Sequence, residues 1–227
     1  RLAASQEKKK KPEDPMRFQK SLVLAGAAAA FAACVATTHA DVIVLDTFDG
    51  PQGALGQNRT LVQDVFSNPY GWDEPLVTTV NEGAGAYLFA AKTGVAGTGW
   101  VVYDGFGDGL DAVALGVIGF QLDFADADQD FQLVIELDTY DDGGGIAGTA
   151  TATATVNAAM VDVAIEDFSF AGAFDPTNIN QVSLKFNLDG AAVALDFALT
   201  EFSAIIPAPP AFALLAFGLA GTRRRRA

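Results

Sequence analysis

Two stretches near the C-terminal end of the chain alternate apolar and polar residues with a period of two, which is the spacing of a β-strand. The first covers residues 182–188 and the second covers residues 193–199. Asp189-Gly190 lies between them and is a dipeptide typical of two-residue type I′ turns. The pattern therefore predicts a hairpin with all of its apolar side chains on one face. The expected pairs are Leu188–Ala191, Phe186–Val193, Leu184–Leu195 and Val182–Phe197, with Lys185 diagonal to Asp196 on the other face.

The same alternation recurs along the middle of the chain. It predicts further strands at residues 42–45, 87–90, 100–103, 120–124, 133–138 and 161–165. Segments rich in glycine and aspartate, such as 105–109 and 141–145, separate the strands, and no stretch shows the period of an amphipathic helix. Many short strands joined by tight turns are typical of an antiparallel β-sandwich. We therefore expect one all-β domain over residues 41–205, with the topology of a jelly roll.

Charge is distributed very unevenly along the 227 residues. Between residues 41 and 205 there are 25 acidic residues but only three basic ones, Arg59, Lys92 and Lys185. A net charge of −22 in this segment excludes nucleic acid as a partner, because phosphate binding needs clustered lysine and arginine. The acidic surface suits a secreted protein that must stay soluble. It also allows Ca²⁺ binding or tolerance of high salt.

The single cysteine, Cys34, and the single histidine, His39, both precede the acidic domain. They fall in a segment that resembles a signal peptide, so the mature domain has neither residue type. This excludes disulfides, a thiolate nucleophile, an imidazole base and an ordinary zinc site. We therefore expect no catalytic residues and no cofactor, with Ca²⁺ as the one ion that the composition leaves open.

An apolar segment near the N-terminus has the layout of a secretory signal. It has, in order, a start at Met16, positive charges at Arg17 and Lys20, an apolar core over residues 22–35 and a small-residue cleavage site that ends at Ala40. We expect a signal helix over residues 16–40, a mature chain that begins at Asp41, and residues 1–15 that are disordered or untranslated. An alternative is a lipid-modified N-terminus at Cys34, although Phe31 stands where such signals usually have leucine.

A proline motif, a short apolar run and a cluster of arginines follow one another at the C-terminal end. They are Ile206-Pro207-Ala208-Pro209-Pro210, residues 211–222, and Arg223, Arg224, Arg225 and Arg226. Proline keeps the motif extended, and the arginines act as a cytoplasmic stop. The apolar run predicts a helix of roughly 18 Å, which is short for a bilayer core of about 30 Å. A temporary membrane anchor that is cut fits this layout better than a permanent one.

This C-terminal layout resembles the PEP-CTERM class of sorting signals, in particular the variant whose motif reads Val-Pro-x-Pro-Ala. The chain departs from the pattern because Ile206 replaces valine and no glutamate lies between the prolines. The resemblance covers residues 206–227. It implies passage through the secretion machinery, processing by an exosortase-like enzyme at the inner membrane, and delivery to the cell surface or extracellular matrix. An ordinary tail anchor or an amphipathic tail is the alternative.

Three carboxylates at 136–141 are candidates for glycoside hydrolysis. Glu136, Asp138 and Asp141 resemble the Glu-x-Asp-x-x-Glu strand of laminarinase-type glycoside hydrolases. Retaining hydrolysis needs a nucleophile and an acid about 5–5.5 Å apart, and Glu136 and Asp138 fall on one strand face. Asp141, however, stands where that family has a longer glutamate as its acid/base. A solvated strand face in an acidic chain explains the residues more simply.

Two other polar segments have weaker candidate roles. Asp126, Asp128 and Asp130 alternate as in Ca²⁺ loops, but the segment lacks the glycine and the terminal glutamate of an EF-hand, so an acidic turn explains it equally well. Residues 149–155 place four threonines on one strand face. Such a ladder can order water or ice. An exposed or edge strand of high β-propensity is the simpler interpretation.

Six aromatic residues are candidates for stacking on sugars: Trp72, Trp100, Tyr70, Tyr87, Tyr103 and Tyr140. Most aromatic residues of a sandwich lie in its core, so Tyr70-Gly71-Trp72, in a segment with Pro69 and Pro75, is the better exposed candidate. The sequence leaves three functions open. They are a non-enzymatic surface or matrix domain, a carbohydrate-binding module that contacts extracellular polysaccharide, and a glycoside hydrolase.

Overall fold

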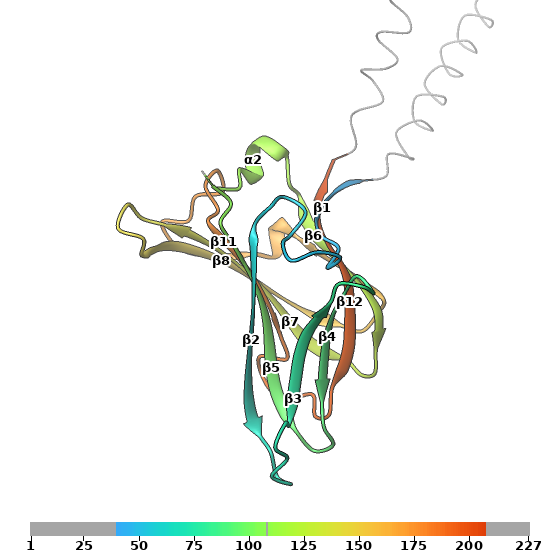
Figure 1. Ribbon diagram of the computed structural model, residues 1–227. Helices are drawn as coiled ribbons and strands as arrows, with labels where there is room; N and C mark the ends of the chain where they lie inside the picture. The colour runs from blue at the N-terminus through green and yellow to red at the C-terminus, as the bar shows by residue number, and fades with distance from the viewer. Residues whose placement is uncertain (1–39, 108, 208–227) are drawn as a thin grey trace, which may run out of the picture. The chain divides into compact units, whose positions relative to one another are not determined.

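A computed structural model describes residues 40–107 and 109–207, and there the chain forms two antiparallel β-sheets packed face to face (Figure 1). Sheet A has the order β3 (Leu76–Asn81), β4 (Ala86–Ala91), β12 (Asp196–Ile206), β6 (Gly119–Ala127) and β9 (Met160–Ala164), and β1 (Asp41–Asp46) also pairs with β12. Sheet B has the order β10 (Ser169–Gly172), β8 (Ile146–Val156), β7 (Phe131–Tyr140), β11 (Gln181–Phe186), β5 (Ala96–Asp104) and β2 (Asn58–Ser67). The predicted all-β sandwich is confirmed.

The strand order is that of a jelly roll. Four antiparallel pairs, β4–β12, β5–β11, β6–β9 and β7–β8, nest inside one another along the chain, and successive pairs alternate between the two sheets. In this part of the chain helical structure is limited to α2 (Ala112–Leu115) and a 3-10 turn at Ile165–Asp167. No helix here is long and apolar enough to cross a membrane.

The predicted hairpin at residues 182–199 is wrong. β11 and β12 belong to different sheets, and Phe186 pairs with Gly99 of β5 and Leu133 of β7 rather than with Val193. Apolar side chains of the two segments do face each other, but they do so through the core of the sandwich. Leu188 and Val193, which the hairpin would have placed on its apolar face, are 38% and 45% exposed.

Asn187 explains why the chain crosses to the other sheet here. Its backbone has a φ of 54°, a left-handed conformation that asparagine tolerates better than most residues. Its buried side chain donates to Gly97 O at 2.8 Å and to Ala192 O at 2.9 Å, and it accepts from Ala192 N at 3.0 Å. These bonds tie the crossover to β5. A turn does form at residues 187–190, but it joins two sheets.

Phenylalanine side chains from both sheets fill the centre of the core. Phe197 of β12 lies 4.7 Å from Phe131 and 5.0 Å from Phe186 between ring centroids, and Phe89 stacks on it at 5.1 Å. A buried ion pair closes one end of the sandwich, where Arg59 of β2 reaches both oxygens of Asp46 at 2.6 and 2.9 Å. The two sheets are thus joined by stacked rings in the middle and by charge at one end.

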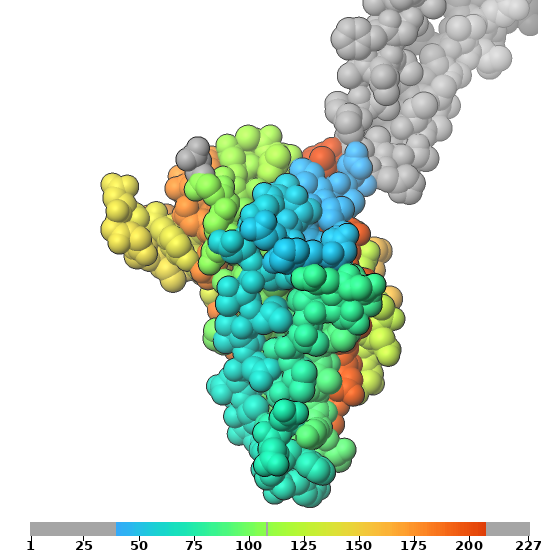
Figure 2. Space-filling model, viewed as in Figure 1, coloured from blue at the N-terminus to red at the C-terminus, as the bar shows by residue number. Residues whose placement is uncertain are grey.

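The two ends of the domain lie side by side. Asp41, the first residue of β1, pairs with Ile206, the last residue of β12 (Figure 1). Figure 2 shows that the β2–β3 loop lies at the opposite extremity of the domain. The chain thus enters and leaves the domain at one end, and loops form the other.

Candidate functional site

The outward face of sheet B carries a continuous set of polar side chains. Along β7, Leu133, Ile135 and Leu137 point into the core, so Glu136 and Asp138 point outward. The pairing of β7 with β11 and β8, and of β11 with β5, places the outward residues of four strands in adjacent rows. We call this surface the polar face; it consists of Thr98, Trp100, Val134, Glu136, Asp138, Tyr140, Thr149, Thr151, Gln181, Ser183 and Lys185.

Trp100 is held in place on β5, at one side of the polar face. Its indole Nε1 donates to Thr98 Oγ1 at 3.0 Å, and Lys185 Nζ lies 5.1 Å from the centroid of its ring. Lys185 also forms an ion pair with Glu136 at 2.7 Å. The three side chains come from neighbouring strands, β5, β11 and β7. Together they give a half-buried aromatic ring with a cation and a carboxylate beside it.

Asp138 lies within a hydrogen-bonded network on the same face. It is 1% exposed, accepts from Thr149 Oγ1 at 2.6 Å and from Gln181 Nε2 at 3.3 Å. Burial raises the pKa of its carboxyl above the ordinary value; the Thr149 hydrogen bond opposes this shift and the nearby Glu136 adds to it. Tyr140 Oη donates to Gln181 Oε1 at 2.7 Å. These hydrogen bonds hold the side chains of Asp138, Tyr140, Thr149 and Gln181 in fixed positions.

The candidate glycosidase residues are only partly brought together. Glu136 and Asp138 share a face, as predicted, but Glu136 is paired with Lys185. Asp141 lies in the β7–β8 turn, where its Oδ1 accepts from the backbone N–H groups of Gly143 and Gly145 at 2.9 and 2.8 Å. Its carboxylate therefore stabilises the turn, and it does not extend the row formed by the other two.

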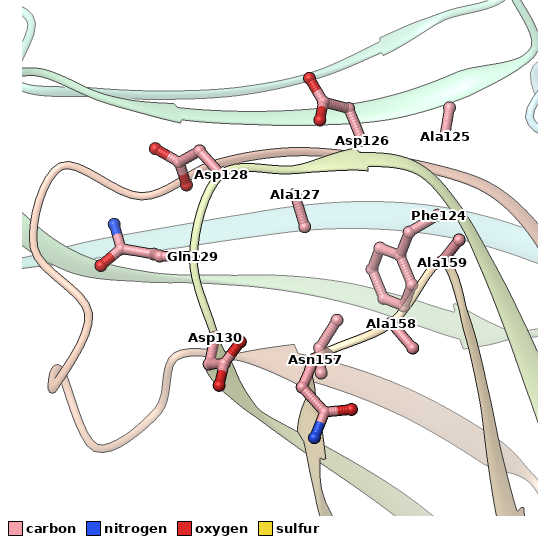
Figure 3. A pocket seen from close by; sticks show the side chains of 11 residues that line it. Phe124, Ala125, Asp126, Ala127, Asp128, Gln129, Asp130, Asn157, Ala158 and Ala159 are labelled. Atoms are coloured by element: carbon pink, nitrogen blue, oxygen red, sulfur yellow. The ribbon is translucent and has the colours of Figure 1, made fainter.

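The acidic loop at 126–130 lines a surface hollow of about 330 Å³ between the β6–β7 and β8–β9 turns. Asp126, Asp128 and Asp130 point in different directions around it (Figure 3). Asp128 Oδ1 accepts from the backbone N–H of Asp196 at 3.0 Å. Among the residues that the structure describes, no three His, Cys, Asp or Glu side chains come together to hold a metal ion. Asp128 thus links the loop to the start of β12.

The six candidate aromatic residues divide between core and surface. Tyr87 and Tyr103 are buried, whereas Trp100 and Tyr140 lie on the polar face. Tyr70 and Trp72 are 67% and 43% exposed, so the prediction that their segment is accessible is confirmed. The threonines at 149–155 face outward on β8 while Ala150 and Ala152 fill the core, and β10 covers only the first part of that strand.

Few of the predicted processing residues can be placed. Asp41 begins β1 directly after Ala40, Ile206 ends β12, and Pro207 follows it. The remaining residues of the sorting motif, the apolar run, the arginines and the signal helix lie outside the described residues. The polar face itself was not predicted as a unit, although Trp100 and Glu136 were each named. Alternation shows which way a side chain points, but it does not show which strands are neighbours.

The sequence matches no protein-family model and no curated protein. Several solved structures are similar in fold. A family 11 carbohydrate-binding module from Clostridium thermocellum, solved with a β-1,3-1,4-mixed-linked tetrasaccharide, has a TM-score of 0.42 and 14% identity over 73% of this chain and 96% of its own. A family 29 carbohydrate-binding module, CBM29-2, has a TM-score of 0.38 and 9% identity over 74% and 87%. The agarase AgWH50C has a TM-score of 0.38 and 13% identity over 65% of this chain and 24% of its own. At these identities the likeness concerns the arrangement of strands alone.

Proposed function

We propose that the domain binds a neutral polysaccharide on its polar face and does not cleave it. The observation that carries the proposal is the Trp100 ring, fixed by Thr98 and Lys185 beside a ready-made set of hydrogen-bonding groups. A sugar ring presents C–H groups on its faces and hydroxyls around its edge. An aromatic ring with amide and carboxylate neighbours matches both, and binding sites commonly combine an apolar surface with a few fixed polar groups.

The charge of the domain favours an uncharged ligand. Lys185 is the one cation on the polar face, and it is already paired with Glu136. An anionic polysaccharide would meet the negative charge of the domain, which carries 25 acidic and three basic residues between positions 41 and 205. A neutral glycan avoids this repulsion and still uses the hydrogen-bonding groups of Gln181, Tyr140 and Glu136.

Several contacts support binding rather than hydrolysis. The Glu136 carboxylate is engaged by Lys185, and the Asp138 carboxyl is buried beneath hydrogen bonds. Asp141 is tied to the backbone of its turn. Retaining or inverting hydrolysis needs two carboxyl groups that flank the scissile bond in complementary protonation states and reach its atoms.

The two tryptophans of the chain make the test direct, because Trp72 lies outside the polar face and Trp100 lies on it. In the Trp72→Phe variant, Trp100 is the only tryptophan, and its emission reports on the polar face. Titration with soluble β-1,3-1,4-glucan and a panel of other neutral and acidic polysaccharides should give a saturable change of emission with at least one neutral polymer. Unchanged emission with every polymer would overturn the proposal.

A second substitution in the same background locates the ligand. Lys185→Met keeps most of the unbranched side chain but removes the charge beside Trp100 and Glu136, so we expect an affinity at least tenfold lower. Thr155→Ala, at an exposed position near the end of β8, is the matched control and should bind as the parent does. Release of reducing ends that depends on Glu136 would contradict a binding-only role.

We further propose that the domain is exported and sorted through its predicted terminal signals. The proposal is supported by the order of the signal peptide, the proline motif and the arginines along the chain. It predicts an inner-membrane intermediate and a mature protein at the cell surface or outside the cell. The mass of the mature protein, with and without residues 206–227, tests it: an intact C-terminus in the wild-type protein would count against sorting by cleavage.

A further inference from the structure

A second aromatic site lies in the loop between β2 and β3. Asn68-Pro69-Tyr70-Gly71 forms a turn in which Gly71 N donates to Asn68 O at 3.2 Å and Gly71 has a φ of 67°. This order of asparagine, proline and a final glycine is favoured in type I turns. The Asn68 side chain then donates to Trp72 O at 2.9 Å and accepts from Trp72 N at 3.0 Å. The loop is therefore closed on both sides of Tyr70 and Trp72.

The turn between β4 and β5 contacts both rings. Tyr70 lies so close to Gly94 that a Cβ at Gly94 would be 2.7 Å from Tyr70 Cε2. The Trp72 Nε1 lies 3.4 Å from Thr93 O, and Lys92 Nζ lies 5.4 Å from the centroid of the Trp72 ring. The two rings are 6.2 Å apart with an angle of 60° between their planes. We call Tyr70, Trp72 and Lys92 the aromatic tip.

Exposure of these rings is costly and is not forced by the fold. Tyr70 is 67% exposed and Trp72 is 43% exposed, although the core of the same domain buries rings of the same kind. Leaving an aromatic side chain in water forgoes the roughly 25 cal/mol per Å² that burial would provide. The hydrogen bonds of Asn68 and the contacts with Thr93 and Lys92 hold the loop in this arrangement. Two fixed, exposed aromatic rings are the arrangement that a binding surface needs.

The position of the aromatic tip relates it to both the chain ends and the polar face. Asp196, at the first position of β12, pairs with Ala90, two residues before Lys92, whereas Ile206 at the other end pairs with Asp41. The tip thus lies about ten residues of strand, or roughly 33 Å, from the place where the chain enters and leaves the domain. The supporting turn leads directly into β5, where Trp100 follows Ala96 by four residues, or about 13 Å.

Charge around the aromatic tip limits the choice of partner. Asp73 and Glu74 are exposed and follow Trp72 directly, and Lys92 already lies against the indole ring. Anionic lipids, nucleic acids and acidic polymers would meet these carboxylates. A partner with apolar ring faces and uncharged hydroxyls has no such penalty, and carboxylates can accept hydrogen bonds from its hydroxyl groups.

We propose that the aromatic tip is a second contact site for the same neutral polysaccharide, so that one polymer chain touches Tyr70 and Trp72 as well as the polar face. This inference rests on the proposed function. Two contacts linked within one rigid domain raise the apparent affinity for a long polymer well above that of either contact alone. Short oligosaccharides, which cannot reach both places, do not gain from the second contact.

The Trp100→Phe variant tests the inference, because Trp72 is then the only tryptophan and reports on the tip. Addition of the polymer identified through Trp100 should change the emission of Trp72 and protect it from acrylamide quenching. In the wild-type chain, Tyr70→Ala should lower affinity for the long polymer about tenfold and leave affinity for a short oligosaccharide within twofold. Phe170→Ala is the matched control, since Phe170 is 62% exposed on β10. It should change neither affinity.

Each outcome separates the two proposals. A response of Trp100 without a response of Trp72, with polymer affinity unchanged by Tyr70→Ala, overturns the tip and leaves the polar face intact. A response of Trp72 alone would overturn the polar face and, with it, the inference that one polymer touches both places. A response of Trp72 to neutral phosphatidylcholine vesicles but to no polysaccharide would identify the tip as a membrane contact and overturn this inference. Circular dichroism of Tyr70→Ala establishes that the variant is folded, and Tyr70→Phe, which keeps the ring, should retain affinity.

Discussion

Phe186 and Phe197 pack against each other with ring centroids 5.0 Å apart, although the strands that carry them belong to different sheets. Only ten residues separate them along the chain, so the crossover at 187–195 brings them together across the core. The contact between the two rings therefore joins the two sheets. In a hairpin both residues would have lain in one sheet. Four other rings, those of Tyr87, Phe89, Phe124 and Phe131, also lie against Phe197.

Removal of the Phe197 ring should weaken the fold strongly. Phe197→Ala opens a cavity among five aromatic neighbours, and we expect a loss of about 3–5 kcal/mol in the free energy of unfolding. Phe170→Ala removes the same ring from an exposed edge position and should change stability by less than about 0.5 kcal/mol. Chemical denaturation of both variants gives the comparison. Equal losses would contradict the central place of Phe197 in the core.

Asn187 stabilises the crossover through its left-handed backbone conformation and through its side-chain hydrogen bonds, and two variants separate these contributions. Asn187→Gly keeps the positive φ but removes the side-chain bonds to Gly97 and Ala192, so their backbone groups lose partners at about 1–3 kcal/mol. Asn187→Ala adds the strain of a left-handed conformation, about 1–2 kcal/mol more. We therefore expect melting temperatures in the order wild type, glycine variant, alanine variant. An alanine variant as stable as the glycine variant would show that the conformation carries no strain.

Two carboxyl groups with raised pKa values should make the domain more stable at mildly acidic pH than at neutral pH. Burial raises the pKa of Asp123, and Glu201 and Asp162 add to the shift; burial also raises the pKa of Asp138. The folded domain therefore keeps protons on these groups at pH values where the unfolded chain has released them. Stability then falls as pH rises from about 4 towards neutrality.

Variants of these aspartates check the sign of the effect. Asp123→Asn removes a carboxylate whose Oδ1 is buried without a hydrogen-bond partner, so this variant should be more stable than the wild type at pH 7 and show a shallower dependence on pH. Asp142→Asn removes the same charge from an exposed turn and serves as the control for net charge. Thermal melts between pH 4 and pH 8 give the slopes. A wild-type domain that becomes more stable as pH rises over this range would contradict the prediction.

The hydroxyl of Tyr87 is an unsatisfied polar group in the core, and its removal should stabilise the domain. It is buried without a hydrogen-bond partner, and burial raises the pKa of Tyr87 well above its ordinary value. Tyr87→Phe removes this unsatisfied group and keeps the ring, so we expect a gain of about 1 kcal/mol in the free energy of unfolding. Tyr140→Phe removes a hydroxyl that donates to Gln181 and should lower stability instead. Denaturant titrations of both variants test the contrast.

Alternation along the chain predicted the fold class because it reports burial directly. In β7, Leu133, Ile135 and Leu137 point into the core and Glu136 and Asp138 point outward, as their types indicate, whereas Val134 is an apolar residue on the outward side. β5 was predicted only from residue 100, yet it begins at Ala96, because Gly97 and Gly99 interrupt the apolar pattern. Gly99 leaves room for Tyr87, whose hydroxyl would lie 2.5 Å from a Cβ there. β2, β3 and β10 were missed, since their alternation is irregular or short.

The neighbours of a strand cannot be deduced from its alternation. The segments around Asp189-Gly190 have matching apolar faces, and such faces fit together equally well across a hairpin or across a sandwich core. The polar face depends on the same unknown, because Trp100, Glu136 and Lys185 come from β5, β7 and β11. Only the pairing of these strands places the ring, the carboxylate and the ammonium group together. The aromatic tip was easier to find, since its turn residues are consecutive in the sequence.

The pairing of Asp41 with Ile206 has a mechanical consequence. A force applied between Asp41 and Ile206 separates β1 from β12 by unzipping. The hydrogen bonds then break one at a time, so the pair offers little mechanical resistance. A pull between Ile206 and a polymer held at the far loops acts along the length of β12, which is bonded to β6 on one side and to β4 and β1 on the other. The strand then resists by shear, with many hydrogen bonds loaded at once. A domain tethered at Ile206 and gripping a polymer at its other extremity would thus carry tension along its most extensively paired strand.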